Sequence, residues 1–250
     1  MYQQQRGFLS SIPPVTKNLI LINCLMWVAT ITLPKIMGLD LVQYLGLHYW
    51  TAPDFNPAQL ITNMFMHDPS SIFHLFFNMF SLFLFGKVLE QVWGSKRFLF
   101  YYLSTGIGAA LLQELVWMLT WENSFALVNP ETKQIVMSGE DAVQYALAHR
   151  LDLITSYLNS YVSIGASGAV FGILLAFGML FPNAPMYVMF IPIPIKTKYV
   201  VVGYGLIELF FGVAGIQASV AHFAHLGGML FGLLIILYWR KKGVIGGRIY

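Results

Sequence analysis

A serine sits between glycines at the start of a strongly apolar stretch. Ser167 follows Gly165 by two positions and directly precedes Gly168, within the sequence IGASGAVFG. Glycines on both sides remove side chains from around the hydroxyl, so another backbone can come close. Such a hydroxyl can act as a nucleophile if a base takes its proton. The same residues are also typical of a helix-packing face, because Gly168 and Gly172 form a G-x-x-x-G step.

Two histidines, His222 and His225, open another apolar stretch. A neutral imidazole can accept a serine proton near pH 7 and later return it to a leaving amine. His225 lies three residues before Gly228, and Gly228 and Gly232 allow a neighbouring helix to approach closely. The spacing therefore favours His225 as the partner of Ser167, with His222 as a polar residue at the cavity rim. A simple interhelical hydrogen bond would use the same histidine without chemistry.

A third group of polar residues, His74 and Asn78, has the i, i+4 spacing that places both side chains on one helix face. Both residues can donate hydrogen bonds, and donors aimed at a developing oxyanion are usually a large part of catalysis. The alternative is a structural role, in which the pair holds two membrane helices together.

Apolar residues dominate the chain, since 57% are hydrophobic and only 10% are charged. A soluble domain is roughly 25% charged, so lipid must cover much of this protein. A helix needs about 20 apolar residues to cross the hydrocarbon core. The sequence therefore predicts an all-α membrane protein, a bundle of six transmembrane helices over residues 18–37, 72–93, 98–121, 161–181, 199–216 and 222–239.

The longer connections differ in composition. Residues 38–71 are aromatic but include three aspartates, which predicts short helices in the membrane interface. Residues 122–160 are polar, and the stretch 139–158 predicts an amphipathic helix. Residues 182–198 carry four prolines, enough to break any helix, at Pro182, Pro185, Pro192 and Pro194.

Lysine and arginine are unevenly distributed among these segments. With the N-terminus inside, inner segments hold most of the 14 basic residues, including Arg6 and Arg248, and the outer ones hold only Lys35, Lys133 and Arg150. The positive-inside rule then places both termini in the cytoplasm. The expected layout is a cytoplasmic tail over residues 1–17, a membrane domain over 18–240 and a second tail over 241–250.

This topology brings the polar residues to one depth. The second, fourth and sixth predicted helices all begin on the outer side, and Ser167, His225, His74 and Asn78 lie within about the first two turns of them. At 1.5 Å per residue they would sit roughly 10 Å below the outer surface. A nucleophile, a base and oxyanion donors could therefore converge in one layer.

With these motifs in this order, the chain resembles the rhomboid family of intramembrane serine proteases over about residues 18–240. Four motifs carry the likeness: Gly165-Ala166-Ser167-Gly168, Ala224-His225 with Gly228 and Gly232, His74 with Asn78, and Glu90 with Gly94-Ser95.

The resemblance implies that Ser167 is the nucleophile and His225 the general base, in a dyad without an acid. His74, Asn78 and the backbone N–H of Ser167 would form the oxyanion hole, and Glu90 would tie its helix to the following turn. It implies a water-filled cavity open to the outer face, and substrates that are transmembrane segments with small residues at the cleavage site. No cofactor or metal is expected.

Some features depart from the family pattern or stand outside it. The family often has a Trp-Arg pair in the first outer loop, where this chain has Ala58-Gln59, and the 122–160 connection is longer than the family's usual third loop. Glu208 and Glu114 lie within predicted spans. Both are expected to be protonated or hydrogen-bonded carboxyls facing the bundle.

Other functions compete with this one. A catalytically silent relative that binds membrane proteins would be expected to lack the serine or the histidine, and both are present. A transporter would need polar groups across the full membrane depth. A metalloprotease would need a His-Glu-x-x-His helix or carboxylate ligands near His222 and His225, and neither is expected. Nucleic-acid binding has no support, and the short loops suit a bacterial inner membrane protein.

Overall fold

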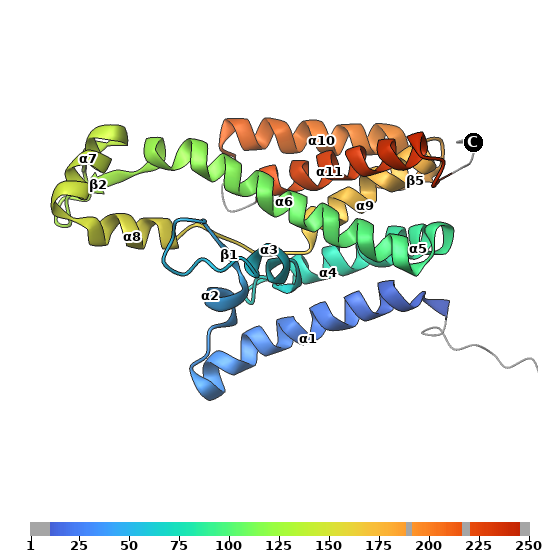
Figure 1. Ribbon diagram of the computed structural model, residues 1–250, viewed down its shortest axis with the longest axis horizontal. Helices are drawn as coiled ribbons and strands as arrows, with labels where there is room; N and C mark the ends of the chain where they lie inside the picture. The colour runs from blue at the N-terminus through green and yellow to red at the C-terminus, as the bar shows by residue number, and fades with distance from the viewer. Residues whose placement is uncertain (1–10, 189–191, 217–220, 246–250) are drawn as a thin grey trace, which may run out of the picture.

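The computed structural model describes residues 11–188, 192–216 and 221–245. Within these residues, five helical stretches are long and apolar enough to cross a membrane. They are α1 (Pro14–Met37), the stretch Ile72–Trp93, α6 (Ser95–Ser124), α10 (Thr197–Ala214) and α11 (His222–Lys241) (Figure 1). All five lie where the sequence predicts spans. Both predicted tails extend beyond the described residues, and Arg6 and Arg248 lie outside them.

The stretch Ile72–Trp93 is continuous but not uniform. α4 (Ile72–Ser81) passes through a π-helical turn, η3 (Leu82–Gly86), into α5 (Lys87–Trp93). Single π turns inside helices are often found near functional sites. Here the turn begins one residue after the end of the helix that carries His74 and Asn78.

The fourth predicted span, residues 161–181, is wrong at its start. α9 (Ser167–Leu180) has only 14 residues, about 21 Å at 1.5 Å per residue, against a hydrocarbon core of roughly 30 Å. The residues before it are extended, because β4 (Val162–Ser163) pairs antiparallel with β1 (Leu47–His48). Gly165 then has a φ of 136°, which is not a helical angle. The helix can therefore begin only after Gly165.

α6, α9 and α11 pack against one another at the centre of the molecule, with α10 on one side and α1 on the other (Figure 1). Small residues allow this approach. A Cβ on Gly228 would overlap the carbonyl oxygen of Gly168, and a Cβ on Gly232 would overlap the hydroxyl of Tyr101. That hydroxyl donates a 2.8 Å hydrogen bond to the carbonyl of Gly172, so the crossing is also fixed by a polar contact.

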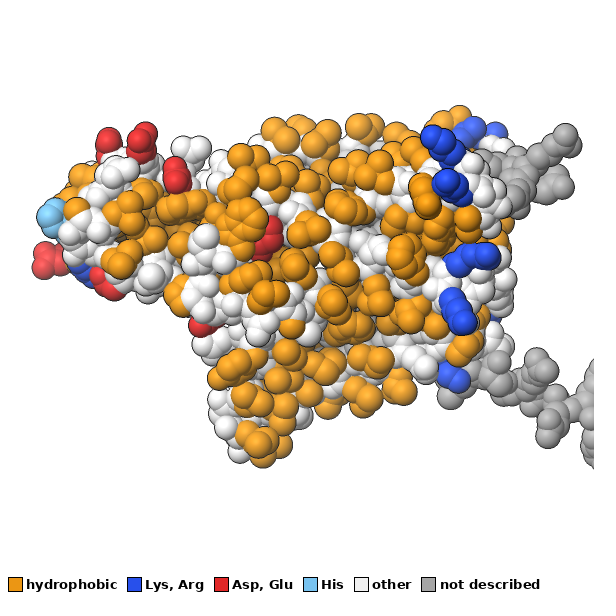
Figure 2. Space-filling model, viewed as in Figure 1, with side chains coloured by type: hydrophobic (Ala, Val, Ile, Leu, Met, Phe, Trp, Pro, Cys, Tyr) orange, Lys and Arg blue, Asp and Glu red, His pale blue; other side chains and the backbone are white. Residues whose placement is uncertain are grey.

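The outer faces of the bundle are apolar. On α10, an exposed stripe recurs every three or four residues, at Tyr199, Val202, Leu206, Phe210 and Val213. An unpaired apolar stripe of this length fits contact with lipid. Figure 2 shows apolar side chains over the middle of the molecule, lysine and arginine at one end, and aspartate and glutamate at the other. The start of α1 and the end of α11 both lie at the basic end.

The connection between α1 and α4 contains α2 (Leu41–Leu45), β1, α3 (Gln59–Thr62) and the 3-10 turn η2 (Asn63–Phe65), so the predicted short helices are present. Gln59, one of the two residues expected at the family's Trp-Arg position, organises this loop. Its buried side chain accepts hydrogen bonds from the N–H groups of His48 and Asn56 and donates to the carbonyls of Tyr44 and Asp54.

The 122–160 connection projects from the acidic end of the molecule (Figures 1 and 2). It forms a hairpin of β2 (Ala126–Val128) and β3 (Ile135–Ser138), followed by α7 (Gly139–His149) and α8 (Leu151–Asn159). The single amphipathic helix predicted over 139–158 is therefore two helices, because Arg150 has an extended φ of -147° between them. After α9, the proline-containing segment pairs β5 (Pro185–Met186) with β6 (Ile195–Lys196).

Glu90 ties three helices together. One carboxylate oxygen accepts from the N–H of Val15 at 3.0 Å and from the hydroxyl of Ser95 at 2.7 Å. The other accepts from the N–H and the hydroxyl of Thr16 at 2.7 and 2.8 Å. The first N–H groups of a helix have no partner within it, so this carboxylate caps α1 from α5. The expected contact with the Gly94-Ser95 turn is present.

Candidate active site

Ser167 is the first residue of α9, and the segment before it holds it in place. The β1–β4 pairing fixes the strand, and the N–H of Gly165 donates a 3.0 Å hydrogen bond to the carbonyl of Asn63. The φ of 136° at Gly165 lies in a region that L side chains rarely adopt, so the turn requires glycine there. The serine hydroxyl is therefore presented at the N-terminus of a helix.

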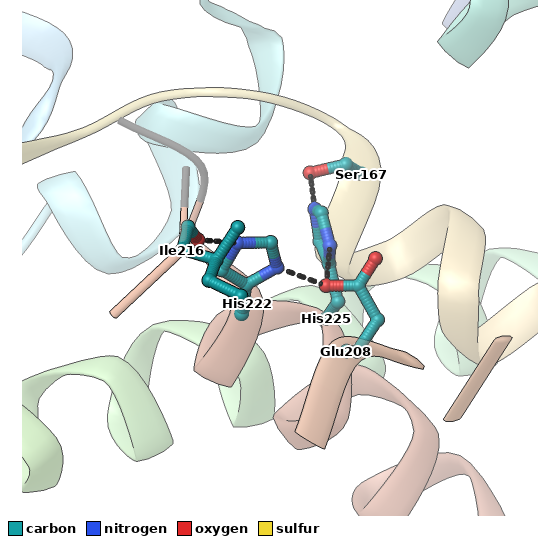
Figure 3. A network of polar contacts seen from close by, with 5 residues as sticks. All are labelled: Ser167, Glu208, Ile216, His222 and His225. Carbon is teal, nitrogen blue, oxygen red and sulfur yellow. Dashed lines mark hydrogen bonds and ion pairs between the residues drawn. The ribbon is translucent and has the colours of Figure 1, made fainter. Parts of the chain in front are cut away.

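His225 reaches this hydroxyl from α11. Its Nε2 lies 2.8 Å from Ser167 Oγ (Figure 3). The imidazole also stacks on the ring of Phe171, with centroids 4.2 Å apart and planes inclined by 6°. Phe171 is one turn after Ser167 on α9, and no motif in the sequence marks it as a site residue. Its only signal was the i, i+4 spacing from the serine. The histidine ring is thus held by its hydroxyl partner and by a flat aromatic surface.

His74 presents a hydrogen-bond donor to the same place. The backbone N–H of Asp68 donates to His74 Nδ1 at 3.3 Å. Because a backbone N–H can only donate, we assign the proton of the neutral ring to Nε2. A Cβ built on Gly165 would lie 2.9 Å from this Nε2 and 3.4 Å from Ser167 Oγ. The donor therefore faces the space beside the serine hydroxyl.

Asn78 and the backbone of Ser167 supply further donors. Asn78 Nδ2 donates to the carbonyl of His74 at 2.9 Å, and a primary amide has a second N–H for another acceptor. Ser167 begins α9, and the first N–H groups of a helix have no partner inside it. The positive end of the helix dipole also lies here. Negative charge beside Ser167 Oγ would meet several donors.

A cavity of about 1090 Å³ connects these groups. Ser167 and His225 line it together with His74, Asn78 and Phe171. Ligand sites commonly measure roughly 300–1,000 Å³. The space is therefore large enough for an extended peptide together with water.

Glu208 of α10 faces two histidines of α11 (Figure 3). Its Oε2 lies 2.6 Å from His222 Nδ1 and 2.9 Å from His225 Nδ1. The other ring nitrogen of His222 lies 3.0 Å from the carbonyl of Ile216. The expectation that no carboxylate lies near these histidines is wrong. His222 does line the cavity, but it is buried and held through both ring nitrogens.

The same three residues have the side-chain types of a zinc site. The two Nδ1–Oε2 separations, 2.6 and 2.9 Å, are hydrogen-bond lengths. Ligand atoms around a tetrahedral zinc with bonds of about 2.0 Å lie roughly 3.3 Å apart. Glu208, His222 and His225 therefore fit a polar network better than a metal site.

Two more polar groups, one on α6 and one in the loop before α4, are buried. Glu114 accepts a 3.0 Å hydrogen bond from the N–H of Trp50, as a hydrogen-bonded carboxyl facing the bundle should. His67 is fully buried, and its ring centroid lies 5.1 Å from that of His74. Burial, and then His74, lower the pKa of His67 to about 3. No pattern in the sequence marked His67, because its burial depends on how the loop before α4 folds back.

Comparison with known proteins supports the assignment of the fold. Residues 54–242 match the family model of the Rhomboid domain. Rhomboid protein 1, mitochondrial, of Saccharomyces cerevisiae is 26% identical over 189 residues, which cover 73% of this chain and 42% of that protein. RHOMBOID-like protein 1 of Arabidopsis thaliana is 27% identical over 220 residues, which cover 85% of this chain and 40% of that protein. Rhomboid-like protein 11, chloroplastic, of Arabidopsis is 26% identical over 224 residues, with 86% and 64% covered.

The chain thus spans less than two thirds of the length of each of these relatives. A mitochondrial and a chloroplastic protein among them give no support to the expected bacterial inner membrane. They do agree with the apolar helices in making this a multi-pass membrane protein. Since the matched region extends from the loop before α3 through α11, this chain belongs to the rhomboid family.

Proposed function

We propose that this rhomboid is an intramembrane serine endopeptidase that cleaves transmembrane segments of other membrane proteins. The observation that carries the proposal is the 2.8 Å hydrogen bond between Ser167 Oγ and His225 Nε2. A serine needs such a base to become an effective nucleophile. The donors on His74 and Asn78 line the same cavity, which is where a peptide carbonyl would enter.

The reaction follows from these positions. Ser167 Oγ attacks the scissile carbonyl carbon while His225 Nε2 accepts the hydroxyl proton. The carbonyl electron pair moves to the oxygen, and the N–H groups of His74, Asn78 and Ser167 stabilise the negative charge. The imidazolium then donates its proton to the departing amine as the C–N bond breaks. Water then attacks the acyl carbon while His225 takes its proton. His225 returns this proton to Ser167 Oγ as the ester C–O bond breaks, which releases a carboxylic acid and restores the serine.

The substrate class follows from the location of the site. Ser167 and His225 lie at the starts of apolar helices, which favours a peptide that comes from a membrane segment. An intact helix uses its carbonyls in its own hydrogen bonds, so helix-breaking residues near the cleavage site should favour attack. Small residues at the cleavage site of the substrate are expected from the family resemblance.

The proposal includes six crossings, with α9 as the short fourth one, and both termini in the cytoplasm. The basic end of the molecule, where α1 begins and α11 ends, supports this orientation (Figures 1 and 2). The cavity would then open on the outer face. The bacterial inner membrane stays a prediction that the organellar relatives do not favour.

A cleavage assay in liposomes tests the proposal. The substrate is a single-span protein with a helix-breaking residue near its outer end. We expect cleavage by the wild type and a loss of about 10⁴-fold or more in Ser167→Ala and in His225→Ala. Ser160→Ala, which alters another serine lining the cavity, is the matched control and should cleave normally. Thermal unfolding in detergent would show that the variants are folded.

Two outcomes would contradict the proposal. Cleavage by folded Ser167→Ala at the wild-type rate would exclude this serine as the nucleophile. No cleavage by a folded wild type would favour the silent family member that binds membrane-protein clients.

A further inference from the structure

We propose that Glu208 is a positioning residue for the general base, so that Ser167, His225 and Glu208 act as a triad in which His222 anchors the carboxylate. This inference rests on the proposed protease activity. It adds an acid that the Ser–His pair by itself lacks.

A continuous line of polar atoms carries the inference (Figure 3). It runs from Ser167 Oγ to His225 Nε2 at 2.8 Å, and from His225 Nδ1 to Glu208 Oε2 at 2.9 Å. The same oxygen meets His222 Nδ1 at 2.6 Å, and His222 Nε2 meets the Ile216 carbonyl at 3.0 Å. The line joins α9, α11 and α10 and ends on the backbone just beyond α10.

The contact with Ser167 determines the tautomer of His225. Its Nε2 must be unprotonated to accept the hydroxyl proton of Ser167, so the one proton of the neutral ring lies on Nδ1. That N–H is on the side of Glu208 Oε2. A carboxylate in this position favours the tautomer that the reaction needs, and it stabilises the imidazolium that forms when Ser167 attacks.

His222 has a polar partner at each ring nitrogen. The Ile216 carbonyl can only accept, so His222 Nε2 carries a proton. The short contact between its Nδ1 and Glu208 Oε2 requires one further proton shared between them. The triad requires the arrangement in which this proton is on His222, so that His222 donates to an ionised carboxylate and Oε2 can also accept from His225.

The alignment at His225 is incomplete. Its Nδ1 is within 2.9 Å of Oε2, but the N–H does not point at the oxygen well enough to form a hydrogen bond. Catalytic hydrogen bonds are often poorly aligned without substrate and tighten when it binds. The N–H of His225 Nδ1 is therefore expected to align with Glu208 Oε2 when substrate binds.

Burial explains why these groups depend on one another. Glu208, His222 and His225 are 8%, 5% and 8% exposed. A buried carboxyl needs hydrogen-bond or charge partners. Among the described residues, neither lysine nor arginine forms an ion pair with Glu208, and its partners are the two histidines.

Glu208→Gln tests the inference, because it keeps the size of the side chain and removes the carboxylate. Glu114→Gln is the matched control, a buried carboxyl in another span that contacts Trp50 instead. We would measure kcat and KM for cleavage, and the rate at which a small fluorophosphonate labels Ser167. Thermal unfolding in detergent would be recorded for each variant.

We expect Glu208→Gln to lower kcat and the labelling rate by about 10²–10⁴-fold, in line with the loss of the acid in other serine triads. KM should change little, because Glu208 acts through His225 and does not touch substrate. Glu114→Gln should keep both rates. Glu208→Asp, which keeps the charge, should restore part of the loss.

The outcomes distinguish a failure of the triad from a failure of the proposed protease activity. Folded Glu208→Gln with kcat and labelling within about threefold of the wild type would overturn the triad and leave the Ser–His pair intact. If Glu208→Gln does not fold, Glu208→Leu, which also lacks the carboxylate, decides, and wild-type rates in folded Glu208→Leu would overturn the triad. A folded wild type that neither labels nor cleaves would instead overturn the protease activity itself.

Discussion

Gly165→Ala is the substitution that most directly probes the space beside Ser167. Two effects combine at this position. The φ of 136° is one that alanine rarely adopts, and holding a side chain in such a region costs about 1–3 kcal/mol. The new methyl group would also lie 2.9 Å from His74 Nε2 and 3.4 Å from Ser167 Oγ.

The first contact is too short, since carbon atoms settle about 3.5–4.0 Å from their neighbours. His74 or the turn must therefore move by roughly half an ångström or more. The methyl group would also enter the region where the oxyanion should meet His74. Losing one oxyanion donor costs about 10²–10³ in kcat. We expect kcat to fall by at least about 10²-fold and unfolding stability to fall by about 1–3 kcal/mol.

The assay compares cleavage rates, labelling of Ser167 and unfolding for Gly165→Ala and Gly38→Ala. Gly38 is the matched control, because it has a φ of 67° but open space around its Cβ position. It should lose stability through backbone strain and keep its activity. Wild-type cleavage by Gly165→Ala would refute the assignment of this space to the oxyanion.

Three further predictions follow from the same geometry. Asn78→Ala should lower kcat by about 10²–10³-fold with little change in KM, if its free N–H serves the oxyanion; steady-state kinetics would show this, and an unchanged kcat would exclude the role. His222→Ala should keep much of the activity, because it reaches the base only through Glu208, whereas complete loss of cleavage would contradict the choice of His225 as the base. The pKa of His67, lowered by burial from 6.5 to about 3, makes stability depend on pH. The folded protein keeps His67 neutral while the unfolded chain takes up a proton below pH 6.5, so stability is full above that pH and is lost as the pH falls toward 3. Between pH 7 and pH 5 the loss is about 2 kcal/mol. Denaturation in mixed micelles should show it in the wild type and not in His67→Gln, and parallel pH dependence in both would contradict it.

Much of the helical framework is specified by short segments of the sequence. Apolar segments of about 20 residues specify membrane helices, and five such stretches occur where the sequence predicts them. Glycines mark the close crossing of α9 and α11, because only small residues permit it. The pairing of Ser167 with His225 could be proposed for the same reason, since each lies beside such glycines near the start of its helix.

The start of α9 could not be predicted from hydropathy. Residues 161–166 are as apolar as a helix would need, yet β4 pairs there with β1 from a loop more than a hundred residues earlier. Hydropathy averages over a window and carries no information on backbone pairing between distant segments. The result is a serine on the first residue of its helix, where backbone N–H groups are free.

The partners of His225 depend on how the helices cross. Phe171 stacks on its ring from α9, and the carboxylate of Glu208 reaches it from α10. In the sequence, Glu208 is one polar residue within an apolar span. Nothing in that span indicates which helix its carboxyl group faces. The sequence alone therefore determined which residue types were available and at what depth. Only the tertiary structure decided which of them meet, because contacts between helices depend on their relative rotation and distance.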